Sequence, residues 1–251
     1  MGSFDTHDVA SPRLSVVVPV KNEVDNVAPL IAEIEAACAP LAPFEIIYVN
    51  DGSTDETAQA LATLAQTRPY LRVLHHDRSC GQSIAVRTGV LMANGPIIAT
   101  LDGDGQNDPM FIPRMVEALK QGPHDGGLVQ GQRVGRKDTE FKRMQSKIAN
   151  RIRRSILRDD TRDTGCGLKV FYRHVYMALP FFKALHRFMP ALVKREGYVV
   201  LLVDVVDRPR LTGASKYGFF DRLWVGIGDL IGVRWLITRR GALPVVVEDK
   251  N

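Results

Sequence analysis

Hydrophobic positions in the first 130 residues form short continuous runs that alternate with longer amphipathic stretches. The runs are rich in Val and Ile and predict buried strands, whereas the amphipathic stretches predict helices. The expected strands are 14–18, 44–49, 71–75, 97–101 and 127–132, and the expected helices are 24–38, 55–66, 81–93 and 109–120. Strands that are apolar on both faces and alternate with helices predict an α/β fold, with a mostly parallel sheet covered on both sides.

Apolar residues in the second half of the chain follow a helical period. They predict a long amphipathic helix with basic residues on its other faces, and they are Phe141, Met144, Ile148, Ile152 and Ile156. A further strand is expected at 197–206, followed by a loop at 207–216.

The last apolar segment, 219–238, predicts a helix interrupted by Asp229 and Arg234. Its uncharged runs are much shorter than the roughly 20 residues that span a bilayer. We expect this helix to lie in the membrane interface, with Trp224 and Trp235 at headgroup depth. The alternative is a helix packed on the protein's own core. A domain of residues 1–217, with halves 14–132 and 133–217, is therefore expected to precede an amphipathic tail of residues 218–251.

Polar clusters follow three of the predicted strands directly. They are 21–23, 51–55 and 102–106. Ligands of parallel sheets bind beyond the carboxyl ends of the strands. The third cluster holds Asp102 and Asp104, a spacing that suits a hard cation such as Mg²⁺ or Mn²⁺ bound together with diphosphate oxygens. Taken alone, Asp-x-Asp is more often an acidic turn.

The net charge of +5 is concentrated in one segment. Residues 133–162 hold 11 Lys or Arg against 4 Asp or Glu, and the remainder holds 22 against 24. This surplus predicts an anionic partner, either a membrane face, a phosphorylated substrate or nucleic acid. Few aromatic residues accompany these charges, so nucleic acid is not expected. Three widely spaced cysteines favour a reducing compartment, and the acidic N-terminus does not resemble a signal peptide.

Successive motifs then resemble the inverting glycosyltransferases of family 2: Pro19-Val20-Lys21-Asn22-Glu23, Asp51-Gly52-Ser53-Thr54-Asp55 and Leu101-Asp102-Gly103-Asp104-Gly105-Gln106. Later segments are similar to the branch that uses polyprenyl phosphates, which includes dolichyl-phosphate mannose synthase and undecaprenyl-phosphate sugar transferases. These segments are Arg133, Phe141-Lys142-Arg143 with Ser146-Lys147, Asp163-Thr164-Gly165-Cys166-Gly167, and Arg210 with Gly213, Ser215 and Lys216.

The resemblance implies a GT-A type fold, a nucleotide-sugar donor and a polyprenyl phosphate acceptor. The donor would be held by Pro19, Lys21, Glu23, Asp51, Asp102, Gly103, Arg210 and Lys216. Asp104 is the expected direct metal ligand, with Gln106 as a neutral ligand and Asp102 nearby or acting through water. Arg133, Arg143, Ser146 and Lys147 are expected to receive the acceptor phosphate, because guanidinium groups match phosphate oxygens. Asp102, Asp104 and Arg133 are the expected catalytic residues.

The acceptor class is inferred from a missing group. Transfer to a hydroxyl needs a general base, and relatives that glycosylate hydroxyls tend to carry Glu-Asp where this chain has Asp163-Thr164. A phosphate is already ionised near neutral pH. The alternatives are a hydroxyl-directed transferase of polysaccharide synthesis and a non-catalytic sugar-nucleotide-binding protein.

The sequence does not identify the donor sugar; a UDP-sugar is favoured over GDP-mannose. We expect a peripheral, monotopic enzyme at the cytoplasmic face of the inner membrane, as a homo-oligomer or with a separate integral-membrane partner.

Overall fold

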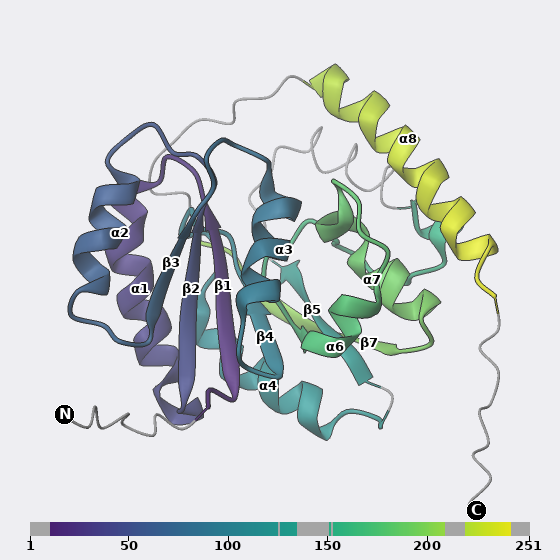
Figure 1. Ribbon diagram of the computed structural model, residues 1–251. Helices are drawn as coiled ribbons and strands as arrows, with labels where there is room; N and C mark the ends of the chain where they lie inside the picture. Colours follow the sequence, from purple (N-terminus) through teal and green to yellow (C-terminus); the bar gives the residue numbers. More distant parts are fainter. Residues whose placement is uncertain (1–10, 125, 135–150, 152, 209–218, 242–251) are drawn as a thin grey trace, which may run out of the picture.

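A seven-stranded sheet forms the centre of the protein in a computed structural model (Figure 1). The structure describes residues 11–124, 126–134, 151, 153–208 and 219–241, and the side chains of 219–225 are outside this description. The strands are β1 (Leu14–Val20), β2 (Phe44–Asn50), β3 (Leu71–His75), β4 (Ile97–Thr100), β5 (Gly126–Val134), β6 (Lys169–Tyr172) and β7 (Val199–Val206). Their order across the sheet is β3-β2-β1-β4-β6-β5-β7.

All pairings in the sheet are parallel except those of β6. This strand runs antiparallel to both neighbours, β4 and β5. The other pairs, including β1 with β4 and β5 with β7, are parallel. The predicted α/β fold with a mostly parallel sheet is confirmed, and the carboxyl ends of β1, β2, β4 and β5 share one edge.

Helices cover both faces of the sheet (Figure 1). One face carries α1 (Val24–Cys38), α2 (Thr57–Ala65) and α4 (Ile112–Gln121), with short 3₁₀ turns at η1 (Ala39–Leu41) and η2 (Pro109–Phe111). The other face carries α3 (Gln82–Met92), α6 (Arg173–Ala178), α7 (Leu185–Arg195) and α8 (Phe219–Thr238).

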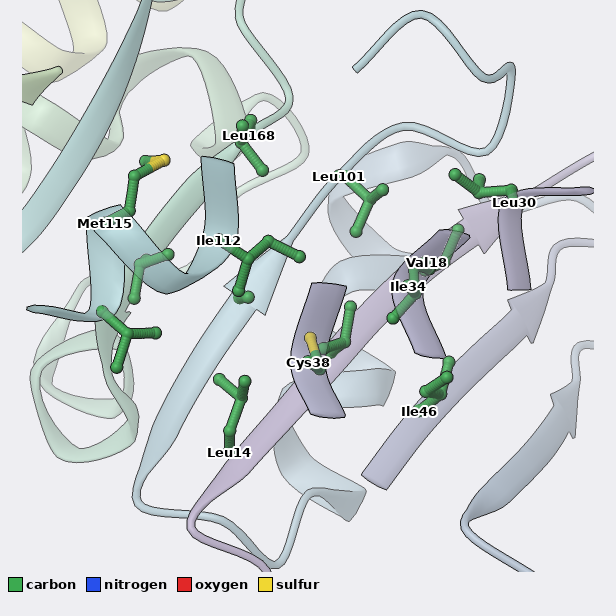
Figure 2. Packing of buried hydrophobic residues seen from close by; sticks show 14 of the residues in the cluster. Leu14, Val18, Leu30, Ile34, Cys38, Ile46, Leu101, Ile112, Met115 and Leu168 are labelled. Carbon is green, nitrogen blue, oxygen red and sulfur yellow. The ribbon is translucent and has the colours of Figure 1, made fainter. Parts of the chain in front are cut away.

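Alternation along the strands builds a separate apolar layer on each face. Figure 2 shows Leu14 and Val18 of β1 near Ile34 and Cys38 of α1, in the layer under α1 and α4. The opposite layer contains Val17, the β1 neighbour of Val18. Successive strand residues point to opposite faces, so a strand buried on both sides must be apolar throughout.

Several boundaries match the sequence prediction, and others differ. Helix α1, strand β3 and helix α8 have the predicted ranges. Helix α2 begins at Thr57 rather than at 55, because the Asp55 side chain accepts a hydrogen bond from the Thr57 N–H (3.1 Å) and so lies outside the helix. The predicted helix 109–120 is divided into η2 and α4. Strand β6 and helices α6 and α7 were not predicted.

Helix α8 has a docked face and an exposed face. Val233 is 1% exposed within the core layer, next to Leu230, Leu236 and Ile237. Ile231 and Trp235 on the other face are 66% and 58% exposed. The alternative of docking on the core therefore holds for one face, and this part of the predicted tail packs against the main body. No helix within the described ranges is long and apolar enough to cross a membrane.

Candidate active site at the carboxyl edge of the sheet

The loop that follows β4 brings two carboxylates to the edge of the sheet. Asp102 and Asp104 line the same pocket, together with Gly103 between them. The loop is fixed from within: the Asp102 N–H donates to Asn107 Oδ1 (3.0 Å) and the Gln106 N–H donates to Asp104 Oδ1 (3.1 Å). Asp104 is only 9% exposed.

The electrostatics of this loop fit a bound cation. Desolvation, followed by the negative charge of Asp104, raises the pKa of Asp102 to about 6. A buried carboxylate whose ionisation is disfavoured by desolvation and by a neighbouring carboxylate is stabilised by a divalent cation. Asp102 and Asp104 offer the hard oxygen ligands that Mg²⁺ or Mn²⁺ prefers. Gln106 follows in the same loop but does not line the pocket, and its amide as a ligand stays a prediction.

Gly167 allows Asp102 to occupy its position. A Cβ at residue 167 would lie 2.4 Å from each atom of the Asp102 carboxyl group. The carboxylate thus packs directly on the backbone that leads into β6. Gln82 of α3 approaches from the other side, and its Nε2 donates to Asp102 Oδ1 (2.6 Å). Asp102 is therefore positioned by three segments far apart in the sequence.

The pocket in front of Asp102 and Asp104 has a volume of about 390 Å³. The predicted donor-binding residues that line it are Pro19, Lys21, Glu23, Asp51, Asp102 and Gly103. They come from the ends of β1, β2 and β4, as expected for a parallel sheet. The structure thus brings together the predicted donor residues that lie in the described ranges.

The Asp51 carboxylate has a structural role in this pocket, because it binds the segment between β3 and α3. Its Oδ1 accepts hydrogen bonds from His76 Nδ1 (2.7 Å) and Cys80 N–H (2.8 Å), and its Oδ2 accepts from Ser79 Oγ and Gly81 N–H (both 2.8 Å). Burial alone would raise the pKa of Asp51, but these hydrogen bonds outweigh it and lower the pKa. Four donors occupy the roughly four lone-pair sites of a carboxylate. Contact between Asp51 and a nucleoside stays a prediction.

Asp51, His76 and Cys80 also place their ligand atoms within 4.8 Å of one another. The hydrogen bonds already account for this grouping, because His76 also contacts Thr88 Oγ1 through Nε2 (2.9 Å). These contacts give His76 a structural role.

The end of β5 holds the segment that precedes β6. Arg133 donates to Asp163 through Nε (2.5 Å) and Nη2 (3.0 Å), and its Nη1 lies 3.4 Å from Asp207. Gln132 accepts hydrogen bonds from the Arg162 and Asp163 N–H groups at 2.9 and 3.0 Å. Burial opposes the charged form of Arg133, but Asp163 and Asp207 raise its pKa above the usual value. Arg133 thus reaches the predicted edge already paired with carboxylates.

Five predicted site residues lie outside the described residues: Arg143, Ser146, Lys147, Arg210 and Lys216. The chain leading to the last two is described as far as Arg208, whose N–H donates to the Gln106 carbonyl (2.9 Å). Asn107 Nδ2 also donates to Asp207 Oδ1 (3.2 Å). The end of β7 is therefore joined to the loop that carries Asp102 and Asp104.

A second pocket, of about 310 Å³, was not expected from the sequence. It shares Pro19, Gln82 and Asp102 with the first pocket, and extends to Lys169 of β6 and to His186 and Arg187 of α7. A lysine inside a short apolar strand, Lys169-Val170-Phe171-Tyr172, was the available signal. Cys166 is buried, and burial raises the pKa of its thiol to about 11, which agrees with a structural turn rather than a nucleophile.

Comparison with known proteins gives a family match and several curated relatives. Residues 15–188 match the model of glycosyl transferase family 2. An undecaprenyl-phosphate 4-deoxy-4-formamido-L-arabinose transferase of Pectobacterium carotovorum is 35% identical over 209 residues, covering 82% of this chain and 63% of the relative. A dodecaprenyl-phosphate galacturonate synthase of Rhizobium johnstonii is 36% identical over 242 residues, covering 91% of this chain and 68% of the relative.

Solved structures share the fold at low sequence identity. Glucosyl-3-phosphoglycerate synthase of Mycobacterium tuberculosis, in complex with Mn²⁺, UDP and glucosyl-3-phosphoglycerate, has a TM-score of 0.66 and 18% identity, covering 91% of this chain and 80% of that one. A mannosyltransferase of Pyrobaculum calidifontis, in complex with GDP-Man and Mn²⁺, has a TM-score of 0.65 and 21% identity, covering 94% and 68%. These likenesses support the predicted GT-A architecture.

Proposed function

Because the chain belongs to glycosyl transferase family 2, we propose that it transfers a sugar from a nucleotide-sugar, preferably a UDP-sugar, to a polyprenyl phosphate. The observation that carries this proposal is the pairing of Asp102 and Asp104 at the mouth of a pocket formed by the ends of β1, β2 and β4. A pocket of that kind is where a parallel sheet binds a nucleotide.

The donor's nucleoside would lie over Pro19, Lys21, Glu23 and Asp51, and its diphosphate beside Asp102 and Gly103. Asp104, Asp102 and Gln106 would hold Mg²⁺ or Mn²⁺, which supplies Lewis-acid stabilisation of the departing nucleoside diphosphate. Arg210 and Lys216 are proposed to add positive charge over the diphosphate when the donor is bound.

The contacts of Asp163 favour a phosphate acceptor over a hydroxyl. Asp163 receives two N–H groups of Arg133 and also the Gly165 N–H (2.9 Å). Hydrogen bonds to the ionised form make a carboxylate a weaker base. A hydroxyl acceptor needs a base, whereas a phosphate monoester is already anionic near neutral pH. Two curated relatives named for polyprenyl-phosphate products support the same acceptor class.

The proposed reaction is a single displacement. An oxygen of the acceptor phosphate forms a bond to the anomeric carbon while the bond from that carbon to the diphosphate oxygen breaks, which inverts the anomeric centre. Arg133, Arg143, Ser146 and Lys147 are proposed to hold the acceptor phosphate. In the structure Arg133 is paired with Asp163, so its proposed contribution includes holding the segment that faces the acceptor.

The test is a donor panel presented to the purified protein with Mn²⁺ or Mg²⁺ and a short polyprenyl phosphate. We expect mass spectrometry to detect a polyprenyl-phosphate sugar of inverted anomeric configuration, formed only with a divalent cation. A sugar acceptor offered in place of the lipid is the matched control. Transfer to the sugar hydroxyl alone would support the polysaccharide alternative, and donor binding without transfer to either acceptor would support the non-catalytic one.

We propose that the exposed face of α8, with Ile227, Ile231 and Trp235, lies against the membrane where the acceptor resides. Arg239 and Arg240 follow this helix and suit an anionic lipid surface. We place the enzyme peripherally on the cytoplasmic face of the inner membrane, either alone, as a homo-oligomer or with an integral-membrane partner.

Substituting the exposed apolar residues of α8 is expected to release the protein from anionic vesicles. An Ile231→Ser/Trp235→Ser variant should lose about tenfold in vesicle affinity because two large side chains no longer leave water. Flotation with vesicles of phosphatidylglycerol and phosphatidylethanolamine measures this. The control is Met110→Ser, which alters an exposed apolar residue on the opposite helical layer. Equal flotation of all variants would contradict the proposal.

A further inference from the structure

The second pocket opens from the first at Asp102. Pro19, Gln82 and Asp102 line both, and the second pocket then continues between β4, β6 and α7. The donor's sugar is bonded to the diphosphate, so it must lie close to the proposed metal ligands. A space that begins at Asp102 meets this requirement. Its volume of about 310 Å³ is at the lower end of the roughly 300–1,000 Å³ usual for small-molecule pockets.

The buried side chain of Lys169 lines this pocket. Lys169 is 4% exposed, and its Nζ donates to the Cys166 carbonyl. No Asp or Glu of the described ranges forms an ion pair with it, and Asp102 and Asp163 act on it only at longer range. Burial lowers the pKa of Lys169. Burying an ammonium group without a carboxylate partner costs stability, so such a lysine is a candidate for ligand binding.

A second cation joins Lys169 at the exposed end of the pocket. Arg187, near the start of α7, lines the pocket with an exposed side chain; it forms no ion pair with a described carboxylate, although its charge and that of Asp229 in α8 interact. His186 beside it is hydrogen-bonded to Ser83 (2.6 Å). Burial, followed by the charges of Lys169 and Arg187, lowers the pKa of His186 to about 3, so this imidazole is neutral. The charged groups of this region are therefore Lys169 and Arg187, with Asp102 and Asp163 acting on Lys169 and Asp229 of α8 acting on Arg187.

The geometry points to a subsite for the transferred sugar in which Lys169 and Arg187 bind an anionic substituent, the carboxylate of a uronic acid. The inference rests on the proposed function. Asp102 would be engaged at the metal and Asp163 is hydrogen-bonded to Arg133, so Lys169 is left to the sugar, with Arg187 beside it under the weaker influence of Asp229. The stacked rings of Phe171 and Tyr176, with centroids 5.4 Å apart, contribute an apolar wall suited to the C–H face of a sugar ring. A neutral hexose would leave the Lys169 ammonium group without an anionic partner, whereas the carboxylate of a uronic acid would provide one.

Equilibrium binding tests this without requiring turnover. Calorimetry with Mn²⁺ would compare UDP, UDP-glucose, UDP-galactose, UDP-glucuronate and UDP-galacturonate. We expect the wild-type protein to bind UDP-glucuronate more than tenfold tighter than UDP-glucose, or UDP-galacturonate more than tenfold tighter than UDP-galactose. Lys169→Met and Arg187→Gln should each remove about tenfold to a hundredfold of that preference, with the affinity for UDP itself changed by no more than about twofold.

Two controls separate recognition from folding. Arg114→Gln removes an exposed arginine on α4, outside both pockets, and should leave the preference intact. Lys169→Met replaces a buried charge with an apolar chain of similar length, so its Tm should be equal or higher. If Lys169 had a structural role instead, Lys169→Met would lower the Tm and would reduce the affinity for UDP and for every UDP-sugar.

Equal affinity of the wild-type protein for UDP-uronates and for their neutral UDP-hexose counterparts would overturn the inference. Variants that reduce the affinity for UDP and for all UDP-sugars by the same factor would also overturn it. A variant that raises the KM for polyprenyl phosphate and leaves sugar preference unchanged would assign the cations to the acceptor's phosphate instead. Preferential uronate binding without transfer to polyprenyl phosphate would contradict the proposed function alone. Transfer with no preference for a uronate would contradict this inference alone.

Discussion

The Asp104→Asn variant is expected to lose about a thousandfold in kcat/KM. Asp104 is the proposed direct metal ligand, and its neighbour Asp102 is already destabilised as an anion in this corner, with a pKa raised to about 6 by desolvation and by Asp104 itself. An amide in place of the carboxylate removes one of the two charges that would hold the cation. Loss of about 4 kcal/mol of leaving-group stabilisation corresponds to this factor.

Steady-state transfer assays across a range of Mn²⁺ concentrations measure the effect, together with Mn²⁺ binding by calorimetry. Asp108→Asn is the matched control, because Asp108 belongs to the same loop but caps η2 and pairs with Arg208. We expect the control to keep its affinity for Mn²⁺. Full activity of Asp104→Asn would exclude Asp104 from the metal site and would remove the central support for the proposed reaction.

The Gly167→Ala variant is expected to lose about a hundredfold in activity while remaining folded. The added methyl group would lie 2.4 Å from every atom of the Asp102 carboxyl group, so the carboxylate must move. A displacement of about 1 Å in a catalytic constellation can cost about a hundredfold. Overpacking at this point should also lower the free energy of unfolding by about 1–3 kcal/mol.

Chemical denaturation and the transfer assay would be measured on the same preparation. Gly228→Ala is the control: Gly228 lies in α8, and no atom comes within 4 Å of an added Cβ. That variant should keep its activity and gain about 0.5–1 kcal/mol from improved helix propensity. An active Gly167→Ala protein would mean that Asp102 has freedom to move without affecting catalysis.

The donor half of the molecule was predictable because its elements follow one rule. Strands such as β1 and β4 are apolar on both faces, and the polar residues that follow them must meet at one edge of a parallel sheet. Pro19, Glu23, Asp51 and Asp104 could therefore be grouped from the sequence, and the structure places them around one pocket.

The second pocket could not be predicted by the same rule. Strand β6 has only four residues, and pairing in the opposite direction brings its first residue, Lys169, to the edge where the other strands end. Helix α7 contains Pro190, which weakens a helical prediction, yet it contributes His186 and Arg187. Contacts such as Gln82 with Asp102 depend on the packing of α3 and have no local sequence signal.

The reversed direction of β6 has an evolutionary consequence. The carboxyl end of β5 and the amino end of β6 lie at the same margin of the sheet, so the polypeptide between them leaves and re-enters at one place. Changes in that connection that spare residues 159–168, which contact Arg133, Gln132 and Asp102, would leave the strand pairings and the nucleotide pocket in place. On the proposed function, related enzymes with this scaffold would change their acceptor by changes in this one connection, while the proposed donor pocket stays the same.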